Sequence, residues 1–242
     1  MTRSSDEQEI RDAVVARLRE LMPAARIVHE LNVAGQGTNR IDVAAIDTAA
    51  IVGAEIKSRK DVLKRLDEQW PAFNRCCHYV VVVAHEKHFA EYRDPHWRDD
   101  VEPYIDLNHP LFFGKWGARD HVWRFPKPDQ PPRYGRCVWH FDRHRDVRTQ
   151  PQASAMLEML WAEELRTECW VHRISATQRS TRPDMIRDMV WHMTGREIVH
   201  AVCRQLRARS FAEADPPIYP DSGATPHSAA TAQPSLLPGG TS

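Results

Sequence analysis

The stretch IDVAAIDTAAIVGAEIKSRKD, residues 41–61, decides how this chain folds. Two segments of small and β-branched apolar residues, 41–46 and 51–57, stand on either side of the polar turn DTAA. Apolar segments of this length, divided by a short turn, predict the two strands of a β-hairpin. Charged residues inside such a hairpin need an explanation, and this one contains two carboxylates and an ammonium group.

The two carboxylates belong to Asp42 and Glu55. A tight loop with Asp47 opposite Ala50 would place Asp42 directly across from Glu55, with their Cβ atoms about 4.5–5.5 Å apart. Ionised carboxylates at this distance repel each other unless they share a proton or a cation. Lys57 lies on the same face as Glu55, one step along the strand. Because Mg²⁺ takes one or two protein carboxylates together with phosphate oxygens, the hairpin predicts a cation site.

The residues around the hairpin predict the order helix, three strands, helix, strand. A serine cap, an acidic first turn and apolar residues at helical spacing predict the first helix: Ile10, Val14, Leu18 and Leu21. The alternating segment 26–33 predicts a strand, and the valine run at 79–84 predicts a strand buried on both faces. Together these elements predict an α/β core over about residues 6–90.

The second helix of this core carries an unexpected polar residue. Ser58 and Asp61 resemble a capping box that would open the helix. Gln69 then falls within its apolar stripe, which consists of Val62, Leu63, Leu66, Trp70 and Phe73. A buried amide needs hydrogen-bond partners, and the face of the hairpin could supply them.

The chain divides into three predicted parts. Residues 1–150 form one domain, whose segment 85–152 is irregular apart from a hairpin within 112–125. Residues 151–209 are helical, with apolar sets at helical spacing that include Leu160, Trp161 and Leu165, then Ile186 and Val190. Residues 210–242 are rich in Pro, Gly, Ser and Ala, and we expect them to be a disordered tail.

Composition excludes several classes of protein. The chain is 42% apolar and 27% charged, and no apolar run reaches the roughly 18–20 residues of a membrane span. Its first residues resemble neither a secretory signal nor a transit peptide, so we expect a cytoplasmic protein. The five cysteines form no C-x-x-C pair, which favours reduced thiols.

The formal net charge of zero is an average over unlike parts. After residue 209 the chain has three acids and no Lys or Arg, which leaves 33 basic and 30 acidic residues before that point. A site that binds phosphates needs a local basic rim rather than a basic total. Four basic residues flank the hairpin and could form such a rim or a solvated helix face: Arg40, Lys60, Lys64 and Arg65.

The spacing of Asp42, Glu55, Lys57 and Gln69 resembles the PD-(D/E)XK nuclease superfamily. That superfamily has an acid on one strand and Glu-x-Lys on the next, and RecB-type domains add Gln-x-x-x-Tyr on the following helix. The segment EIKSRKD is also similar to the corresponding strand end of archaeal Holliday-junction resolvases. MmcB-like bacterial DNA-repair proteins share the strand EIKS, the helix RL-x-x-Q, the valine strand and LW-x-x-EL, strongly over residues 7–88 and loosely to about 209.

The resemblance implies a restriction-endonuclease-like αβββαβ core, a mixed sheet flanked by helices, followed by the helical segment. It implies Mg²⁺-dependent hydrolysis of DNA phosphodiesters, with Mn²⁺ able to substitute, in DNA repair, recombination or a mobile-element or phage context. Asp42, Glu55 and the carbonyl of Ile56 would be metal ligands, and Lys57 the catalytic base or charge stabiliser. DNA would be the partner, and a homodimer would match the resolvases, which pair to cut two strands.

The chain departs from the superfamily pattern at three positions. Ile41 stands where the superfamily name has proline, and Phe73 replaces the tyrosine, which removes a hydroxyl group. Pro71 deletes a backbone donor inside the second helix, so we expect a kink just after Gln69.

Two alternatives stay open at this point. The superfamily often adds one more acid, and Glu30 on the first strand is preferred here to Glu9 in the first helix turn, where acids simply favour the helix dipole. The alternative function is a catalytically inactive nuclease-fold module that binds DNA or acts as a scaffold.

Other residue groups have both a functional and a structural interpretation. Two histidine pairs are spaced like metal ligands but lack a third ligand: His85 with His88, and His140 with His144. Four tryptophans could stack on bases or fill a core: Trp97, Trp116, Trp123 and Trp139. Three arginines of the helical segment could contact DNA or belong to a bundle that covers the sheet: Arg204, Arg207 and Arg209.

Overall fold

The computed structural model describes residues 4–33, 39–88, 122–126 and 150–219. These residues form a five-stranded mixed sheet with helices on both faces, which confirms the predicted α/β fold. The strands lie in chain order: β1 (Arg26–Asn32), β2 (Arg40–Ile46), β3 (Ile51–Lys57), β4 (Tyr79–His85) and β5 (Val122–Phe125). Pairing is antiparallel from β1 to β3 and parallel from β3 to β5.

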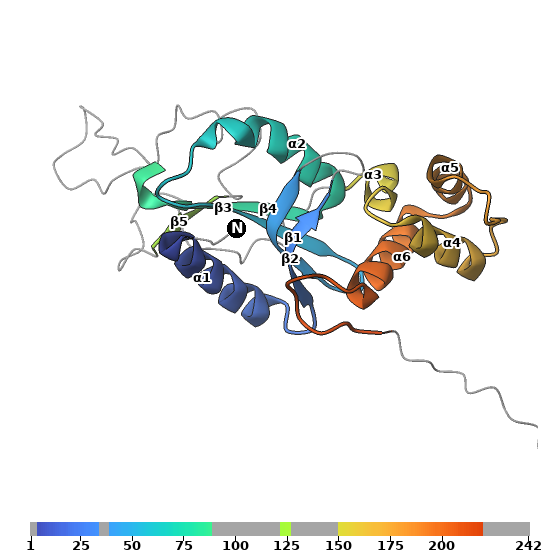
Figure 1. Ribbon diagram of the computed structural model, residues 1–242, viewed down its shortest axis with the longest axis horizontal. Helices are drawn as coiled ribbons and strands as arrows, with labels where there is room; N and C mark the ends of the chain where they lie inside the picture. The colour runs from blue at the N-terminus through green and yellow to red at the C-terminus, as the bar shows by residue number, and fades with distance from the viewer. Residues whose placement is uncertain (1–3, 34–38, 89–121, 127–149, 220–242) are drawn as a thin grey trace, which may run out of the picture.

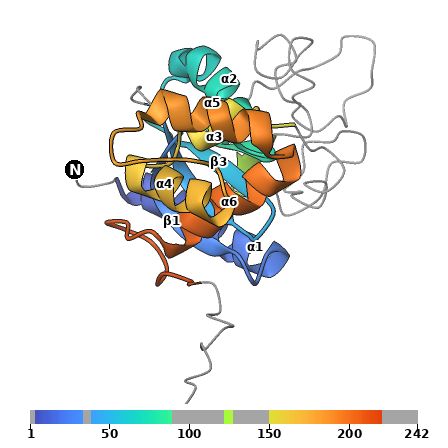
Figure 2. The same ribbon diagram turned by 90° about the vertical axis from the view of Figure 1, so that its right-hand side faces the viewer.

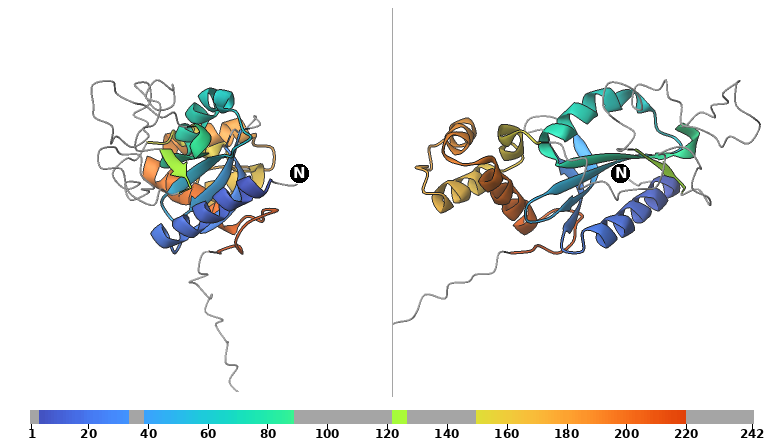
Figure 3. Two further views of the ribbon diagram at one scale, coloured as in Figure 1. Left: turned by 90° about the vertical axis from the view of Figure 1, so that its left-hand side faces the viewer. Right: turned by 180° about the vertical axis from the view of Figure 1, so that it is seen from behind.

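The helices lie in two groups. α1 (Ser5–Leu21) covers one face of the sheet and α2 (Leu66–Cys76) covers the other (Figures 1 and 3). Four helices gather beyond one end of the sheet (Figures 1 and 2): α3 (Ala153–Leu157), α4 (Ala162–Val171), α5 (Arg182–His192) and α6 (Gly195–Ala208). One apolar cluster continues from the α2 side of the sheet into these helices, so both parts share a core. Within the described ranges, no helix has the length and apolar character to cross a membrane.

The hairpin has the predicted register. On β2 and β3, Val43 lies opposite Ala54. The backbone N–H of Asp47 donates to the carbonyl of Ala50 at 2.9 Å and closes the two-residue loop. The valine strand β4 lies beside β3 and is buried on both faces, as its composition predicts.

The regular alternation of side chains between the two faces of the sheet is interrupted at one position in both β1 and β2. Two pairs of residues three apart pack into the same apolar cluster, namely Val28 with Leu31 on β1 and Ile41 with Ala44 on β2. Strict alternation would place residues three apart on opposite faces. Glu30 has a φ of 54°, in the left-handed region, which accounts for the change on β1. Asp42 lies at the matching step of β2, so alternation alone does not fix the direction of its side chain.

The helix after β3 begins later than the sequence predicts. The N–H of Ser58 donates to Asp61 Oδ2 at 2.6 Å, and the N–H of Asp61 donates to the carbonyl of Ser58 at 3.2 Å. These contacts make a turn rather than a helix start, since a short 3₁₀ turn (Leu63–Arg65) separates them from α2. Val62 was expected in the apolar stripe, but it precedes the helix and is 69% exposed.

The segment between β4 and the helices is described only around β5. A hairpin was predicted within residues 112–125, and its other strand lies outside the described residues. β5 pairs with β4 in parallel. Trp123 on β5 is fully buried, so its ring fills the core and has no face free for a base. Trp97, Trp116 and Trp139 lie outside the described residues.

The helical segment follows the predicted pattern with two exceptions. Trp161 was placed in an apolar stripe, but α3 and α4 are separate helices and Trp161 caps the second, 60% exposed. Its ring lies 4.5 Å from the guanidinium carbon of Arg209. Val190 is 42% exposed. The predicted core positions of α6 are buried: Ile198, Val202 and Leu206.

The arginines at the end of α6 hold the helical segment together. Each one contacts groups of the protein: Arg204 binds Glu168, Arg207 binds the carbonyls of Ala24 and Ile46, and Arg209 binds Glu164 and the carbonyl of Met159. Of the two interpretations of these arginines, the geometry favours the bundle that packs against the sheet.

The residues directly after α6 are ordered, which corrects the predicted boundary of the tail. Residues 210–219, here called the strap, run along the outer edge of β1, where Ala214 pairs with Val28. Arg26 reaches from β1 and donates to carbonyls at the end of α6 and in the strap: Leu206, Arg207, Arg209 and Asp215. Arg19 of α1 binds the carboxylate of Asp215 at 2.6 Å. The strap therefore ties α1, β1 and α6 to one another. Residues 220–242 of the predicted tail lie outside the described residues.

This arrangement predicts two different effects of shortening the chain. A chain that ends at Arg209 loses the strap, so its free energy of unfolding should fall by about 2–4 kcal/mol, since several hydrogen bonds worth roughly 1 kcal/mol each disappear. A chain that ends at Tyr219 keeps these contacts and should unfold like the full chain. Urea unfolding followed by circular dichroism measures both. Equal stability of the two shortened chains would contradict a structural role for the strap.

Candidate functional site

The candidate acids lie where β2 and β3 part. The antiparallel pairs of the hairpin end at Val43 and Ala54. Beyond them, the N–H of Ile56 donates to Asp42 Oδ2 at 2.7 Å, so a side chain replaces the next contact between the strands. Asp42 thus stands between the two strands at the open end of the hairpin. Its side chain is 23% exposed.

Glu55, Lys57 and Gln69 form a buried hydrogen-bonded set. Lys57 Nζ donates to Glu55 Oε1 at 2.7 Å and to Gln69 Oε1 at 3.3 Å. The three residues are only 3%, 7% and 7% exposed, respectively. α2 continues through Pro71, and Gln69 faces the hairpin as its place in the apolar stripe predicts. The strand and the helix thus bring together three of the predicted site residues.

Burial raises the pKa values of both acids, and a neighbouring negative charge raises each of them further. The pKa of Glu55 rises to about 8, first because the carboxyl is buried and second because Asp42 is negatively charged, while Lys57 acts in the opposite direction. The pKa of Asp42 rises to about 6, again mainly through burial, against the hydrogen bond from Ile56 and the charge of Arg11. A buried pair of this kind is unfavourable when both groups are ionised.

The donor set suits a hard divalent cation. Glu55 Oε2 is buried and has no hydrogen-bond partner among the described residues. Such an orphaned oxygen is costly unless it finds a proton or a cation. Carboxylate oxygens are the ligands that Mg²⁺ prefers, and one or two of them suffice when water and phosphate complete the shell. No group of three His, Cys, Asp or Glu within the described ranges could hold a metal, so Asp42 and Glu55 would act as a pair.

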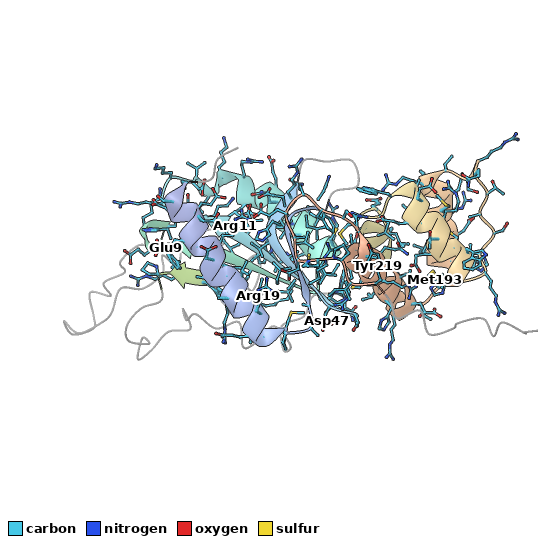
Figure 4. The ribbon with its side chains drawn as sticks, turned by 60° about the horizontal axis from the view of Figure 1, so that its bottom comes forward. Glu9, Arg11, Arg19, Asp47, Met193 and Tyr219 are labelled. Carbon is cyan, nitrogen blue, oxygen red and sulfur yellow. The ribbon has the colours of Figure 1, made fainter. Side chains whose placement is uncertain are left out.

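The preferred candidate for the additional acid, Glu30, lies on β1 and contacts an arginine of α1. Glu30 lies 3.3 Å from Arg11 Nη2, and Arg11 Nη2 lies 3.6 Å from Asp42 Oδ1, so Glu30 stands next to the site. Glu9 is exposed, and Figure 4 shows it on the other side of α1 from Arg11. Glu7 makes the helix contact to Arg11 instead, at 3.1 Å. Sequence reasoning missed Arg11, although a charged residue directly after Ile10 in an apolar stripe was a signal that could have found it.

The histidine pair at the end of β4 is engaged elsewhere. His88 Nε2 lies 2.9 Å from the carbonyl of Ser58, and His85 Nδ1 accepts the N–H of Lys87 at 3.1 Å. A ring nitrogen that donates to a carbonyl has no lone pair for a metal. His88 therefore supports the turn after β3. His140 and His144 lie outside the described residues.

An exposed basic cluster directly follows Lys57. Its members are Arg59, Lys60, Lys64 and Arg65, and all four are exposed. None of them forms an ion pair with another residue that the structure describes. Arg40, at the start of β2, is exposed as well. Three of the four residues that were predicted as a rim or a solvated helix face, Lys60, Lys64 and Arg65, thus lie exposed together with Arg59 on the chain that leaves the candidate site.

Comparison with known proteins gives one match. A family model described as Bacteriophage P4 protein cII matches residues 1–97. No curated protein matches the chain, and no solved structure matches it. The matched part is less than half of the chain, but it contains α1, the hairpin, α2 and β4, and therefore every residue of the candidate site.

The raised pKa of Glu55 predicts how stability depends on pH in metal-free protein. Because the folded-state pKa lies above the unfolded value, folding favours the protonated acid, and stability should fall as pH rises from about 4.5 to about 8. Glu55→Gln removes the ionisable group, so it should flatten this fall and stabilise the protein at pH 8 by a few kcal/mol, since each pKa unit corresponds to about 1.4 kcal/mol. Urea unfolding in EDTA at several pH values measures this.

The control for this measurement is Glu163→Gln, which removes an acid whose side chain is 80% exposed. It should leave the pH profile unchanged. A Glu55→Gln profile that falls as steeply as that of the wild type would contradict the assignment.

Proposed function

We propose that the chain is a metal-dependent deoxyribonuclease that hydrolyses phosphodiester bonds with Mg²⁺, for which Mn²⁺ can substitute. The observation that carries the proposal is the convergence of Asp42, Glu55, Lys57 and Gln69 at the open end of one hairpin, with one buried carboxylate oxygen left unpaired. These are the residues through which the sequence resembles the PD-(D/E)XK nucleases.

The chain supplies each of the roles that this chemistry needs. Asp42 and Glu55 would hold the cation, together with the carbonyl of Ile56. Bound Mg²⁺ supplies Lewis-acid stabilisation of phosphate charge and a water of lowered pKa. Lys57 would act as base or offset charge that develops on the phosphate, and its ammonium group is held by Glu55 and Gln69. The basic cluster after Lys57 would bind phosphates of the DNA backbone on either side of the cleaved bond.

The biological context we propose is that of a mobile element or phage, with DNA repair or recombination as the wider process. The support for a phage context is the match to a family named after bacteriophage P4. That name states no activity, so the support for nuclease chemistry comes from the site alone.

A second candidate function is a DNA-binding or scaffold module that keeps the fold without turnover. Burial of the site favours it: the side chains of Glu55 and Lys57 are 3% and 9% exposed, and Lys57 Nζ lies 2.7 Å from Glu55 Oε1. Asp42 is the most exposed of the three at 23%. A buried contact between Lys and Glu can be purely structural.

Cleavage assays decide between the two functions. Wild-type protein should cut at least one of duplex, single-stranded, flapped or branched DNA in Mg²⁺ or Mn²⁺, and EDTA should abolish cutting. Asp42→Asn and Lys57→Ala should each lower the rate by about 100-fold or more, the usual cost of removing a group that stabilises transition-state charge. Glu163→Gln should cut like the wild type. Absence of wild-type cleavage on all four DNA forms with both metals would favour the module.

The basic cluster predicts the salt dependence of DNA binding. On an Asp42→Asn background in EDTA, replacing Lys60, Lys64 and Arg65 by alanine should reduce the slope of log K against log salt by about two to three, since each phosphate contact contributes roughly 0.9. Arg196→Ala removes an exposed charge from α6 and should leave the slope nearly unchanged. Fluorescence anisotropy at several salt concentrations measures both, and equal slopes would contradict a role of the cluster in binding DNA.

A further inference from the structure

Arg11 is a charged residue buried in the middle of the candidate site. It comes from α1, and its side chain is only 1% exposed. Its Nη1 donates to the backbone carbonyl of Asp42 at 2.5 Å and lies 3.2 Å from His29 Nδ1. Its Nη2 contacts Glu7 at 3.1 Å, Glu30 at 3.3 Å and Asp42 Oδ1 at 3.6 Å. One guanidinium group therefore connects α1, β1 and β2.

A buried guanidinium is costly unless its hydrogen bonds are satisfied. Here two nitrogens of one planar group serve two different purposes: Nη1 binds the backbone of Asp42, and Nη2 faces the carboxylates of Glu7 and Glu30. A lysine could supply the charge but not two fixed nitrogens in one plane. The shape of the group, in addition to its charge, is therefore used.

The contacts fix Asp42 from three sides. Its carbonyl is held by Arg11 Nη1, its Oδ2 by the N–H of Ile56 and its Oδ1 lies near Arg11 Nη2. Asp42 lies at the position where β1 and β2 change the face that packs into the core. The residue opposite it on β1 is Glu30, whose backbone is left-handed. Sheet pairing resumes directly on both sides of this step. At this position regular strand pairing does not fix the backbone of Asp42. The side chain of Arg11 from α1 fixes it instead.

We propose that Arg11 is a positioning residue that sets the place of Asp42 between β2 and β3. The inference rests on the proposed function for its catalytic consequence, since a displaced Asp42 would bind Mg²⁺ less well. The placement of Asp42 can also be tested without metal or turnover. The amide of Ile56 reports on it directly, because this N–H is protected from solvent exchange only while Asp42 Oδ2 accepts its hydrogen bond.

The test compares Arg11→Lys with Arg26→Lys, which alters another buried arginine. Arg26 is 1% exposed and donates to carbonyls of α6 and the strap, so its substitution lowers stability without touching the site. In metal-free protein, hydrogen exchange of the Ile56 amide should be at least tenfold faster in Arg11→Lys than in the wild type. In Arg26→Lys, hydrogen exchange of the Ile56 amide should accelerate only by the same factor as exchange of the β4 amides. Equal behaviour of Ile56 in both variants would overturn the proposal.

Catalysis provides a second readout. Arg11→Lys should weaken Mg²⁺ binding and lower kcat by at least tenfold, while KM for DNA changes less than threefold. Unchanged Mg²⁺ affinity and kcat, with loss of stability alone, would overturn the positioning role and leave the nuclease function intact. A wild type that cuts no DNA would end the proposed function, and Ile56 exchange would still decide the role of Arg11.

A milder variant covers the case in which Arg11→Lys does not fold. Glu30→Gln changes a side chain that is 42% exposed and removes one of the carboxylates that hold Nη2. It should accelerate exchange at Ile56 by about threefold or more, with β4 amides unaffected. No change at Ile56 in Glu30→Gln would count against the proposal in the same way.

Discussion

Two carboxylates in a low-dielectric hairpin are the constraint on which the rest of this site depends. Burial raises the pKa of both Asp42 and Glu55, and the negative charge of Asp42 raises the pKa of Glu55 further. Three neighbouring groups lower the free-energy cost of burying these charges. They are the ammonium of Lys57, the guanidinium of Arg11 and the N–H of Ile56. One oxygen, Glu55 Oε2, is left without any partner among the described residues. The hairpin is thus a local weakness in stability, which is the usual property of a functional site.

The fold supplies the partners from opposite faces of the sheet. α1 lies on one face and provides Arg11, while α2 lies on the other and provides Gln69 (Figure 3). The open end of the hairpin lies between them, so both helices determine where the acids stand. The strap strengthens this arrangement from the edge, because it binds Arg19 of α1 and pairs with β1 next to His29. The strap therefore stabilises the frame of the candidate site, although none of the site residues named above lies in it.

The sequence predicted the elements of the sheet and the closeness of Glu55, Lys57 and Gln69, because the hairpin and the helix stripe follow from short-range patterns. The register of the hairpin follows from its two-residue loop, and β4 from its run of valines. Arg11 was missed because its partners on β1 and β2 lie 18 to 31 residues away, and its place beside Ile10 was the one local signal. The predicted start of α2 was too early because Asp61 accepts the N–H of Ser58 within a turn, a contact that the acid of a capping box also makes. The strap was assigned to the disordered tail because its order comes from β1 and Arg26 rather than from its own composition.

If the proposed function is right, Asp42 and Glu55 should exchange a proton for a divalent cation. Titration calorimetry with Mg²⁺ at pH 7, in two buffers of different ionisation enthalpy, tests it most directly. Since the pKa of Glu55 is raised to about 8, the metal-free protein holds a proton there at pH 7. Binding should therefore release about one proton per cation, and Glu55→Gln should abolish both the binding and the proton release. Absence of binding at millimolar Mg²⁺, or binding heats that are the same in both buffers, would contradict the claim.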